Sequence, residues 1–278
     1  MDKGGLNMPQ KNLLSYCQGT LEKGSVLSMA TATPVVEAMP FIQIRGNAYS
    51  YNVVDTLLPT EHRELGADVV ASELESTKVT KSLVILTNSV KTDRALGVMS
   101  DITDIKAEGQ HLAMVSSGKA LEKKVIAELK QMLTDTVAGT KLTGELTIDL
   151  VDDALDAVPN ANMIFVNNKG HRTLKKLFKA EGYTPVEIEA FGRRVVSYNG
   201  IPVVPSQDLG DNEILVVKFA EDGVHGITNG GLRVYEKEVG VFHVADTELL
   251  YNVVAKIKNS FALVEFTGGA VLSVKAKK

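Results

Sequence analysis

Two β-rich segments separated by a long polar stretch constrain the fold of this 278-residue chain more than any other feature. The first begins at Phe41 and alternates from Ala48 to Val53 between apolar and small polar residues, which is the two-residue period of a strand. The second runs from Val79 to Asn88. If each strand has about 12 to 15 residues, the hairpin is about 40 to 50 Å long. A compact chain of this size has a radius of gyration of only about 19 Å.

The expected hairpin therefore reaches beyond its own domain and needs burial from elsewhere. Ordering the backbone costs about 1 to 2 kcal/mol per residue, and a lone two-stranded ribbon buries too little apolar surface to offset that cost. We expect the ribbon, with its polar stretch from Pro59 to Ser76, to lie on another chain. The alternative is that it folds back on its own core.

The segments on either side of the hairpin are predicted to contain helices. Residues 1–23 are polar and contain glycine, which indicates a loose arm, and a short helix interrupted at Pro34 follows. From about Asp101 to Leu133, apolar residues recur at spacings of three, four and seven, which predicts one long amphipathic helix of about 50 Å. Its apolar stripe contains Met114, Leu121, Val125, Leu129 and Met132, and its polar face contains Lys119, Glu122, Lys123, Glu128 and Lys130.

From Thr143 onward, short alternating helix and strand patterns predict a compact α/β unit. Asn199-Gly200 and Asn229-Gly230 are each flanked by β-type residues, so both predict two-residue hairpin turns. Pro202 and Pro205 push the strand after the first turn towards a sheet edge. The other elements expected here are helices at 148–158 and 173–180 and strands at 163–166, 249–257, 261–266 and 270–274.

Composition narrows the function classes. The net charge of -4 and the pI near 5.8 argue against general affinity for free nucleic acid, although Lys175-Lys176 and Arg193-Arg194 are short basic pairs that could touch phosphates. Cys17 is the single cysteine, so no internal disulfide and no cysteine zinc cage can form. The segment from Val26 to Phe41 is too short and too often interrupted for a membrane helix, and we see no signal peptide, so we expect the cytoplasm and no membrane partner.

For every candidate catalytic or metal-binding motif in the sequence, an ordinary structural role or an incomplete motif is the simpler explanation. Asp149, Asp152, Asp153 and Asp156 share one helical face and could hold a hard cation, but the opposite face is apolar, so a solvated face explains them better. The sequence contains neither G-x-S-x-G nor H-E-x-x-H. Near-matches to other motifs, at 62–64, 117–119 and 226–231, each lack required residues. We therefore expect no enzyme activity, no cofactor and no metal.

Several short segments, each weakly specific, occur in a characteristic order. They are Met39–Phe41, Ile44–Tyr51, Gly200–Ser206, Gly230–Val234 and Gly268–Leu272. In this order, and in the succession of arm, hairpin, long helix and compact unit, residues 21–278 resemble the major capsid proteins of tailed double-stranded DNA bacteriophages, which have the Hong Kong 97 fold.

The resemblance implies an α+β fold with an N-terminal arm, an extended β-hairpin loop, a long spine helix, a peripheral sheet and a compact α/β axial domain. The corresponding ranges are 1–40 for the arm, 41–92 for the loop, 93–142 with 237–278 for the peripheral domain, and 143–236 for the axial domain. It also implies a structural subunit that assembles through hexamers and pentamers into an icosahedral shell. The residues expected at the assembly interface are Tyr49, Tyr51, Arg63, Leu83, Ile85, Arg193 and Arg194.

The partners implied are copies of the chain itself, packaged double-stranded DNA bound without sequence specificity, and scaffolding, portal and decoration proteins. The virion is the implied location, after assembly in the host cytoplasm. No charged coiled coil precedes the arm and no Lys and Asn pair for covalent cross-linking can be aligned, so scaffolding and cross-linking stay open.

Two alternatives remain. An encapsulin, which is a cellular nanocompartment of the same fold that loads an enzyme through a peptide, has a similar length, and the absence of Trp weighs mildly against it. A soluble, metal-dependent α/β enzyme would have the face from Asp149 to Asp156 as its only candidate site.

Overall fold

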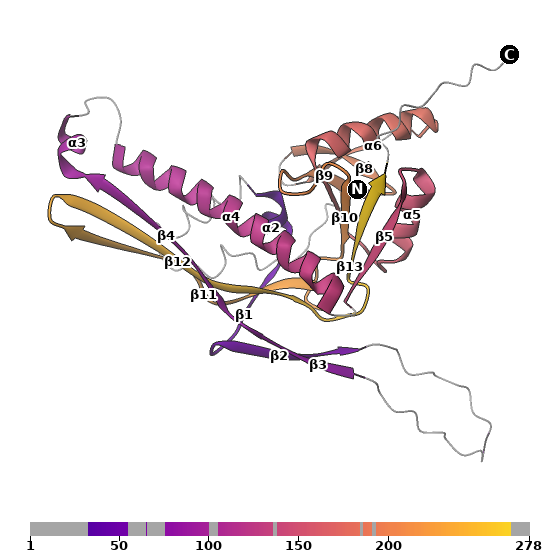
Figure 1. The fold of residues 1–278 in the computed structure, drawn as a ribbon, viewed down its shortest axis with the longest axis horizontal. Coiled ribbons are helices and arrows are strands. Elements are labelled where there is room, and N and C mark those ends of the chain that lie inside the picture. The colour runs from indigo at the N-terminus through magenta and orange to yellow at the C-terminus, as the bar shows by residue number, and fades with distance from the viewer. Residues whose placement is uncertain are drawn as a thin grey trace, which may run out of the picture.

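The computed structural model describes residues 33–54, 65, 76–99, 105–135, 138–183, 186–190 and 193–267. Figure 1 shows a compact end, a long arm along which helix α4 runs, and a two-stranded ribbon that projects near their junction. The helices are α2 (Pro34–Ala38), α3 (Arg94–Met99), α4 (Ile105–Asp135), α5 (Ile148–Asp156) and α6 (Asn168–Ala180). The strands are β1 (Phe41–Gln43), β2 (Ala48–Val54), β3 (Ser76–Ser82), β4 (Val84–Asp93), β5 (Gly139–Glu145), β6 (Met163–Val166), β7 (Val186–Ala190), β8 (Arg193–Tyr198), β9 (Ile201–Pro205), β10 (Glu213–Val217), β11 (Val224–Val239), β12 (Phe242–Ala255) and β13 (Phe261–Thr267).

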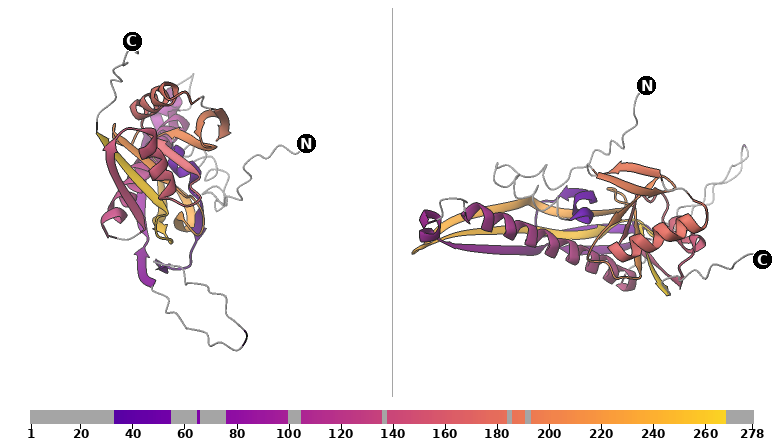
Figure 2. Two further views of the ribbon diagram at one scale, coloured as in Figure 1. Left: turned by 90° about the vertical axis from the view of Figure 1, so that its right-hand side faces the viewer. Right: turned by 90° about the horizontal axis from the view of Figure 1, so that it is seen from above.

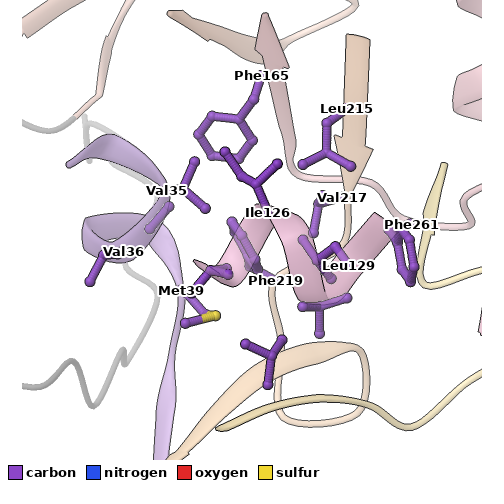
Figure 3. Packing of buried hydrophobic residues seen from close by; sticks show 14 of the residues in the cluster. Val35, Val36, Met39, Ile126, Leu129, Phe165, Leu215, Val217, Phe219 and Phe261 are labelled. Carbon is purple, nitrogen blue, oxygen red and sulfur yellow. The ribbon is translucent and has the colours of Figure 1, made fainter. Parts of the chain in front are cut away.

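A seven-stranded sheet with the order β5-β13-β10-β6-β9-β8-β7 forms the centre of the compact end. Its inner strands β6 and β10 are apolar at nearly every position because both faces of the sheet are covered. On one face, Phe165, Leu215 and Val217 pack with residues of α2 and α4 (Figure 3). On the other face, Ile164 and Val216 pack with residues of α5 and α6. The sheet thus separates two apolar clusters.

Helix α4 lies along the arm and ends against the compact end (Figure 1). Its 31 residues span about 47 Å at 1.5 Å per residue, so the long helix predicted from the apolar spacing is confirmed. The stripe residues Leu121, Val125 and Leu129 are all buried. Glu122 departs from the prediction that it faces solvent: it is only 2% exposed, because α2 and the segment after β9 cover it.

A four-stranded sheet, ordered β1-β11-β12-β4, forms the arm together with α4. β11 and β12 have 16 and 14 residues and are joined by Gly240 and Val241, with Val239 paired to Phe242. Gly240 has a φ of 62°, the left-handed conformation that a tight two-residue turn requires. At ~3.3 Å per residue, β11 is about 53 Å long, and Figure 2 shows how far the arm extends from the compact end.

The two Asn-Gly steps have different outcomes. Asn199-Gly200 forms the predicted hairpin turn between β8 and β9, with both residues at positive φ and Tyr198 paired to Ile201. Asn229-Gly230 does not, because it lies inside β11, where the pairing with β12 shifts between Thr228 and Leu232. The extra residues are accommodated as an irregularity in a strand that continues in one direction, since two successive glycines there adopt positive φ.

The two prolines of β9 were expected to place it at a sheet edge, and this prediction is wrong. β9 lies between β6 and β8 in the interior of the seven-stranded sheet. Pro202 precedes the first pair with β6, which is Ile164 with Val203, and Pro205 follows the last pair with β8, which is Val196 with Val203. Pro202 therefore has no partner in β6, and Pro205 has no partner in β8. Since each proline is paired on one side only, no ladder hydrogen bond is lost.

The structure bears on two further boundaries. Pro34 begins α2 at its first turn, where the missing N–H is tolerated, and the part of the expected helix before residue 33 lies outside the described residues. The expected division between residues 236 and 237 falls inside β11, and β13 belongs to the seven-stranded sheet. The expected arm before residue 33 and the expected last strand, 270–274, lie outside the described residues.

Candidate interaction surfaces

The β2–β3 ribbon is anchored at its base by the chain's own sheet. Tyr51, Val53 and Leu83 are buried in a third apolar cluster with Ile227 and Val254 of the arm. The opposite face of the ribbon is polar and exposed, and it contains Ser50, Asn52, Lys78 and Thr80. One face of the ribbon's base is therefore buried against the chain's own sheet. The sequence had left this open as the alternative in which the ribbon folds back on its own core.

Two aromatic contacts and one backbone bond fix the geometry of this base. Tyr49 stacks on Tyr51 with 5.8 Å between the ring centroids, and Lys256 Nζ lies 5.6 Å from the centre of the Tyr49 ring. Burial raises the pKa of the Tyr51 hydroxyl, as expected for a phenol packed among apolar side chains. The Leu83 N–H donates to Asn47 O at 2.8 Å and turns the chain from the ribbon into the arm.

The described part of each ribbon strand has seven residues, which gives a paired length of about 23 Å. At one end the ribbon stops because Leu83 enters the apolar cluster, and at the other end it adjoins residues outside the described ranges, so the expected 12 to 15 residues stay a prediction. Residues 55–64 and 66–75, between the two strands, lie outside the described residues. The expectation that the ribbon takes its burial from another chain therefore applies to that segment and not to the base.

Of the seven residues expected at an assembly interface, the structure describes the side chains of five, and these five do not share one surface. Tyr49 is half-buried, and Tyr51 and Leu83 are buried inside the chain. Ile85 is 59% exposed on β4, next to Leu250 in the register, and Arg194 is exposed on β8. Arg193 begins β8, and Arg63 lies outside the described residues. An interface role for these residues stays a prediction, and Ile85 and Arg194 are the two with exposed side chains.

The tip of the arm exposes apolar side chains that sequence analysis did not single out. Tyr235, Val239 and Val241 are each about half exposed. An ion pair and a backbone hydrogen bond hold the turn around them. Arg94 pairs with Glu238 at 3.0 Å, and its N–H donates to Val241 O at 3.0 Å. A rigid tip with exposed apolar residues suits contact with another protein, and only the strand alternation in 235–241 could have indicated it.

Glu122 joins three parts of the chain at the junction of arm and compact end. Its carboxylate accepts hydrogen bonds from the Ser206 hydroxyl, just after β9, and from the Val35 backbone N–H in α2. Burial is the main cause that raises the pKa of Glu122 to about 7, and the nearby carboxyl of Asp208 adds to it. Its Oε2 has no hydrogen-bond partner among the described residues. A buried carboxyl of this kind costs stability when it is ionised.

A cleft of about 210 Å³ lies between α2, α6 and the β7–β9 hairpins. Its floor is apolar, with Val195 and Val204, and its rim is charged, with Lys175, Glu187 and Arg194. His171 also lines it, and burial followed by the charge of Lys175 lowers the pKa of that imidazole. The volume is below the roughly 300 to 1,000 Å³ that small-molecule sites usually have, so the cleft suits a side chain or a short peptide segment better than a cofactor.

The acidic face of α5 does not form a metal centre. Asp149, Asp153 and Asp156 are exposed, while Asp152 accepts a hydrogen bond of 2.7 Å from the Tyr198 hydroxyl. Burial and this bond raise the pKa of Tyr198. Within the described part of the chain, no group of three His, Cys, Asp or Glu residues is arranged to hold a metal ion.

Among the helices that the structure describes, none combines the length and apolar character needed to cross a bilayer.

Comparison with known proteins gives matches in structure but not in sequence. No family model matches the chain, and no curated protein matches it. The holo-SrpI encapsulin complex from Synechococcus elongatus matches with a TM-score of 0.66 and 14% identity over 94% of this chain and 92% of that chain. The capsid of an empty GTA particle matches with a TM-score of 0.64 and 16% identity over 95% and 96%. A structure from the Microbacterium phage Oxtober96 matches with a TM-score of 0.63 and 14% identity over 84% and 91%. At such identities the likeness shows the fold, and it extends over most of each chain.

Proposed function

We propose that this chain, whose α+β fold is the Hong Kong 97 fold shared by phage capsids and encapsulins, is a structural subunit of a closed protein shell. The observation that carries the proposal is the shape of the subunit. An arm with strands of 14 and 16 residues projects from the compact end, a separate ribbon projects near their junction, and the arm tip exposes apolar side chains. Such projections are stable when repeated contacts between copies cover them.

Within this class, we propose the major capsid protein of a tailed bacteriophage, assembled through hexamers and pentamers around double-stranded DNA. The ordered segments from Met39–Phe41 to Gly230–Val234 support this choice, as does the likeness to phage structures. In this role the subunit acts without catalysis, in a virion, together with scaffolding, portal and decoration proteins. The proposed peripheral domain, 93–142 with 237–278, contains α4 and β12 of the arm but also β13 of the compact end, and the proposed axial domain, 143–236, contains most of the compact end and most of β11. In this proposal, Ile85, Arg194 and Arg63 contribute to contacts between subunits.

The second candidate is an encapsulin shell, which the likeness to the Synechococcus elongatus encapsulin complex favours. The two candidates differ in what the shell encloses. A capsid encloses nucleic acid, whereas an encapsulin encloses a protein cargo.

Expression followed by negative-stain electron microscopy tests the shared part of the proposal, because shells are directly visible. Replacing residues 56–74 with a short Gly-Ser turn keeps β2 and β3 and is expected to give folded subunits without shells. The matched control inserts the same Gly-Ser turn between the exposed Glu221 and Asp222 of the otherwise unaltered chain. Normal shells from the shortened ribbon would contradict the role of that segment, and a monomer under all conditions, with scaffold present, would contradict the proposed function.

Isolating particles from the native source separates the two candidates. Nuclease-protected double-stranded DNA of uniform length supports the capsid, and a stoichiometric enzyme without protected DNA supports the encapsulin.

A further inference from the structure

The two helices that cover the outer face of the seven-stranded sheet have exposed stripes of opposite charge. In α5 the exposed stripe consists of Asp149, Asp153 and Asp156. In α6 it consists of Arg172, Lys176 and Lys179, with Lys169 and Lys175 beside it. Within the described ranges, Lys169 is the only one of these eight side chains that makes an ion pair, with Asp211 at 2.9 Å. Both stripes are therefore free to meet charges from outside the chain.

The two stripes have the same spacing. Each places its three charges at positions i, i+4 and i+7, so each spans about 10.5 Å along its helix. Both helices are also held firmly. Val151 and Ala154 bury one side of α5, Leu174 and Phe178 bury one side of α6, and the side chains of Thr147 and Asn167 cap the N-termini. Because the helices are already ordered, only the charged side chains lose conformational entropy when the stripes pair, which favours their use at an interface.

The stripes do not neutralise each other inside one subunit. α5 packs on β5 and β13 at one end of the sheet, whereas α6 packs on β6 and β9, which lie about 14 Å away at ~4.8 Å per strand. Tyr198 fills the space between them: its hydroxyl donates to Asp152 of α5, and its ring stacks on Phe178 of α6 with 4.8 Å between centroids. Within the described residues, therefore, neither stripe has a complementary surface.

The geometry points to a second copy of this chain as the partner: the acidic stripe of α5 in one subunit pairs with the basic stripe of α6 in the next. Unlike surfaces that meet in this way form a head-to-tail contact, and a head-to-tail contact closes into a ring when the rotation permits. The inference rests on the proposed shell function and deepens it, because it assigns one contact between neighbours within a ring to named residues.

Nucleic acid is the other partner that a basic helix could attract. Phosphates that approach α6 would also meet the three carboxylates of α5 on the same face of the sheet, and the net charge of the chain is -4. Copies of the chain on the two sides of a subunit suit both stripes, one stripe each, whereas a polyanion suits only one of them.

Charge reversal tests the pairing. One variant carries D149K, D153K and D156K, and the other carries R172E, K176E and K179E; each is expected to reduce shell or ring yield by more than about tenfold because like charges then face each other. Combining all six substitutions is expected to restore the yield. A mixture of the two triple variants is expected to form hexameric rings in which the two variants alternate, whereas a five-membered ring cannot alternate and should stay disfavoured. The matched control, K119E with K123E and K124E on the exposed side of α4, is expected to assemble normally.

A cross-link gives a readout that does not depend on complete shells. In a C17S background, mixing a D153C subunit with a K176C subunit under oxidising conditions is expected to give a disulfide-linked pair of the two different chains. The inference is overturned if the unaltered chain assembles but the variant with all six substitutions does not recover the shell or ring yield and no cross-link forms. The proposed function stands in that case. Failure of the unaltered chain to associate at all would overturn both. Loss of DNA retention in the α6 variant without recovery in the six-fold variant would assign α6 to nucleic acid instead.

Discussion

Replacing Glu122 with Gln is expected to stabilise the folded subunit at high pH and to change little at low pH. The carboxyl is 2% exposed and its Oε2 has no hydrogen-bond partner within the described residues, so the ionised form is penalised by burial. Its pKa in the folded chain is about 7, compared with an ordinary value of 4.5. A difference of this size corresponds to about 3 kcal/mol at 1.36 kcal/mol per pH unit.

The sign follows from proton linkage. Between pH 4.5 and 7 the folded state binds the proton of Glu122 and the unfolded state releases it, so the free energy of unfolding contributed by this group rises as the pH falls. Above pH 7 the folded state carries the full penalty. Gln is always neutral and nearly the same shape, so E122Q should exceed the unaltered chain by about 2 to 3 kcal/mol at pH 8.5 and should approach it near pH 4.5.

The assay is urea unfolding of unassembled subunits, followed by circular dichroism at several pH values between 4.5 and 8.5. The measured quantity is the difference in the free energy of unfolding between E122Q and the unaltered chain, because the titration of all other groups cancels in this difference. Ser206→Ala is the matched control, since it removes the hydroxyl donor but keeps the carboxyl and should be destabilising at pH 8.5 by about 1 to 3 kcal/mol. A difference between E122Q and the unaltered chain that is constant across this pH range would refute the reasoning.

Three further experiments test the packing and the electrostatics of the core. Leu129→Ala on α4 should lower the free energy of unfolding by about 2 to 5 kcal/mol because the side chain is buried between the arm and the compact end; a loss below 1 kcal/mol in urea unfolding would contradict that placement. Gly226→Ala should be destabilising, since a Cβ there would lie 2.4 Å from the Phe41 ring, and Phe41→Leu should partly rescue it in thermal unfolding. Burial, followed by the charge of Lys256, lowers the pKa of His225 to about 4 from 6.5, so His225 should remove up to about 3 kcal/mol of stability as the pH falls from 6.5 to 4. His225→Gln should flatten this acid loss, and an unchanged pH profile would contradict the assignment.

Local sequence patterns were enough to predict several elements of the fold. Helix α4, the buried strand β6 and the turn at Asn199-Gly200 follow directly from residue spacing and turn chemistry. The fold was predicted from the order of such elements together with short segments, and the structural likeness confirms it. Local patterns were informative here because local packing decides these elements.

Tertiary context decided the positions where the predictions were wrong. Glu122 has the spacing of a solvent-facing residue, but α2 and Ser206, which are distant in sequence, cover it. Pro202 and Pro205 lie in an interior strand because the neighbouring ladders are offset along it. Asn229-Gly230 has the chemistry of a turn, but the long pairing of β11 with β12 continues past it. None of these outcomes depends on a property that a short window of sequence contains.

The parallel pairing of β13 with β5 sets the order in which a nascent subunit becomes complete. Phe261 of β13 pairs with Gly139, and its ring fills the space where a Cβ on that glycine would lie. At about 5 to 20 residues per second, a ribosome needs about 6 to 23 s to proceed from the end of β5 to the start of β13. During that interval β5 lacks its neighbour, and Leu129 and Leu133 on α4 lack part of their apolar cover. Synthesis time thus separates the appearance of the first exposed apolar surfaces of the chain from their burial by β13. Chaperones can bind these surfaces during that interval.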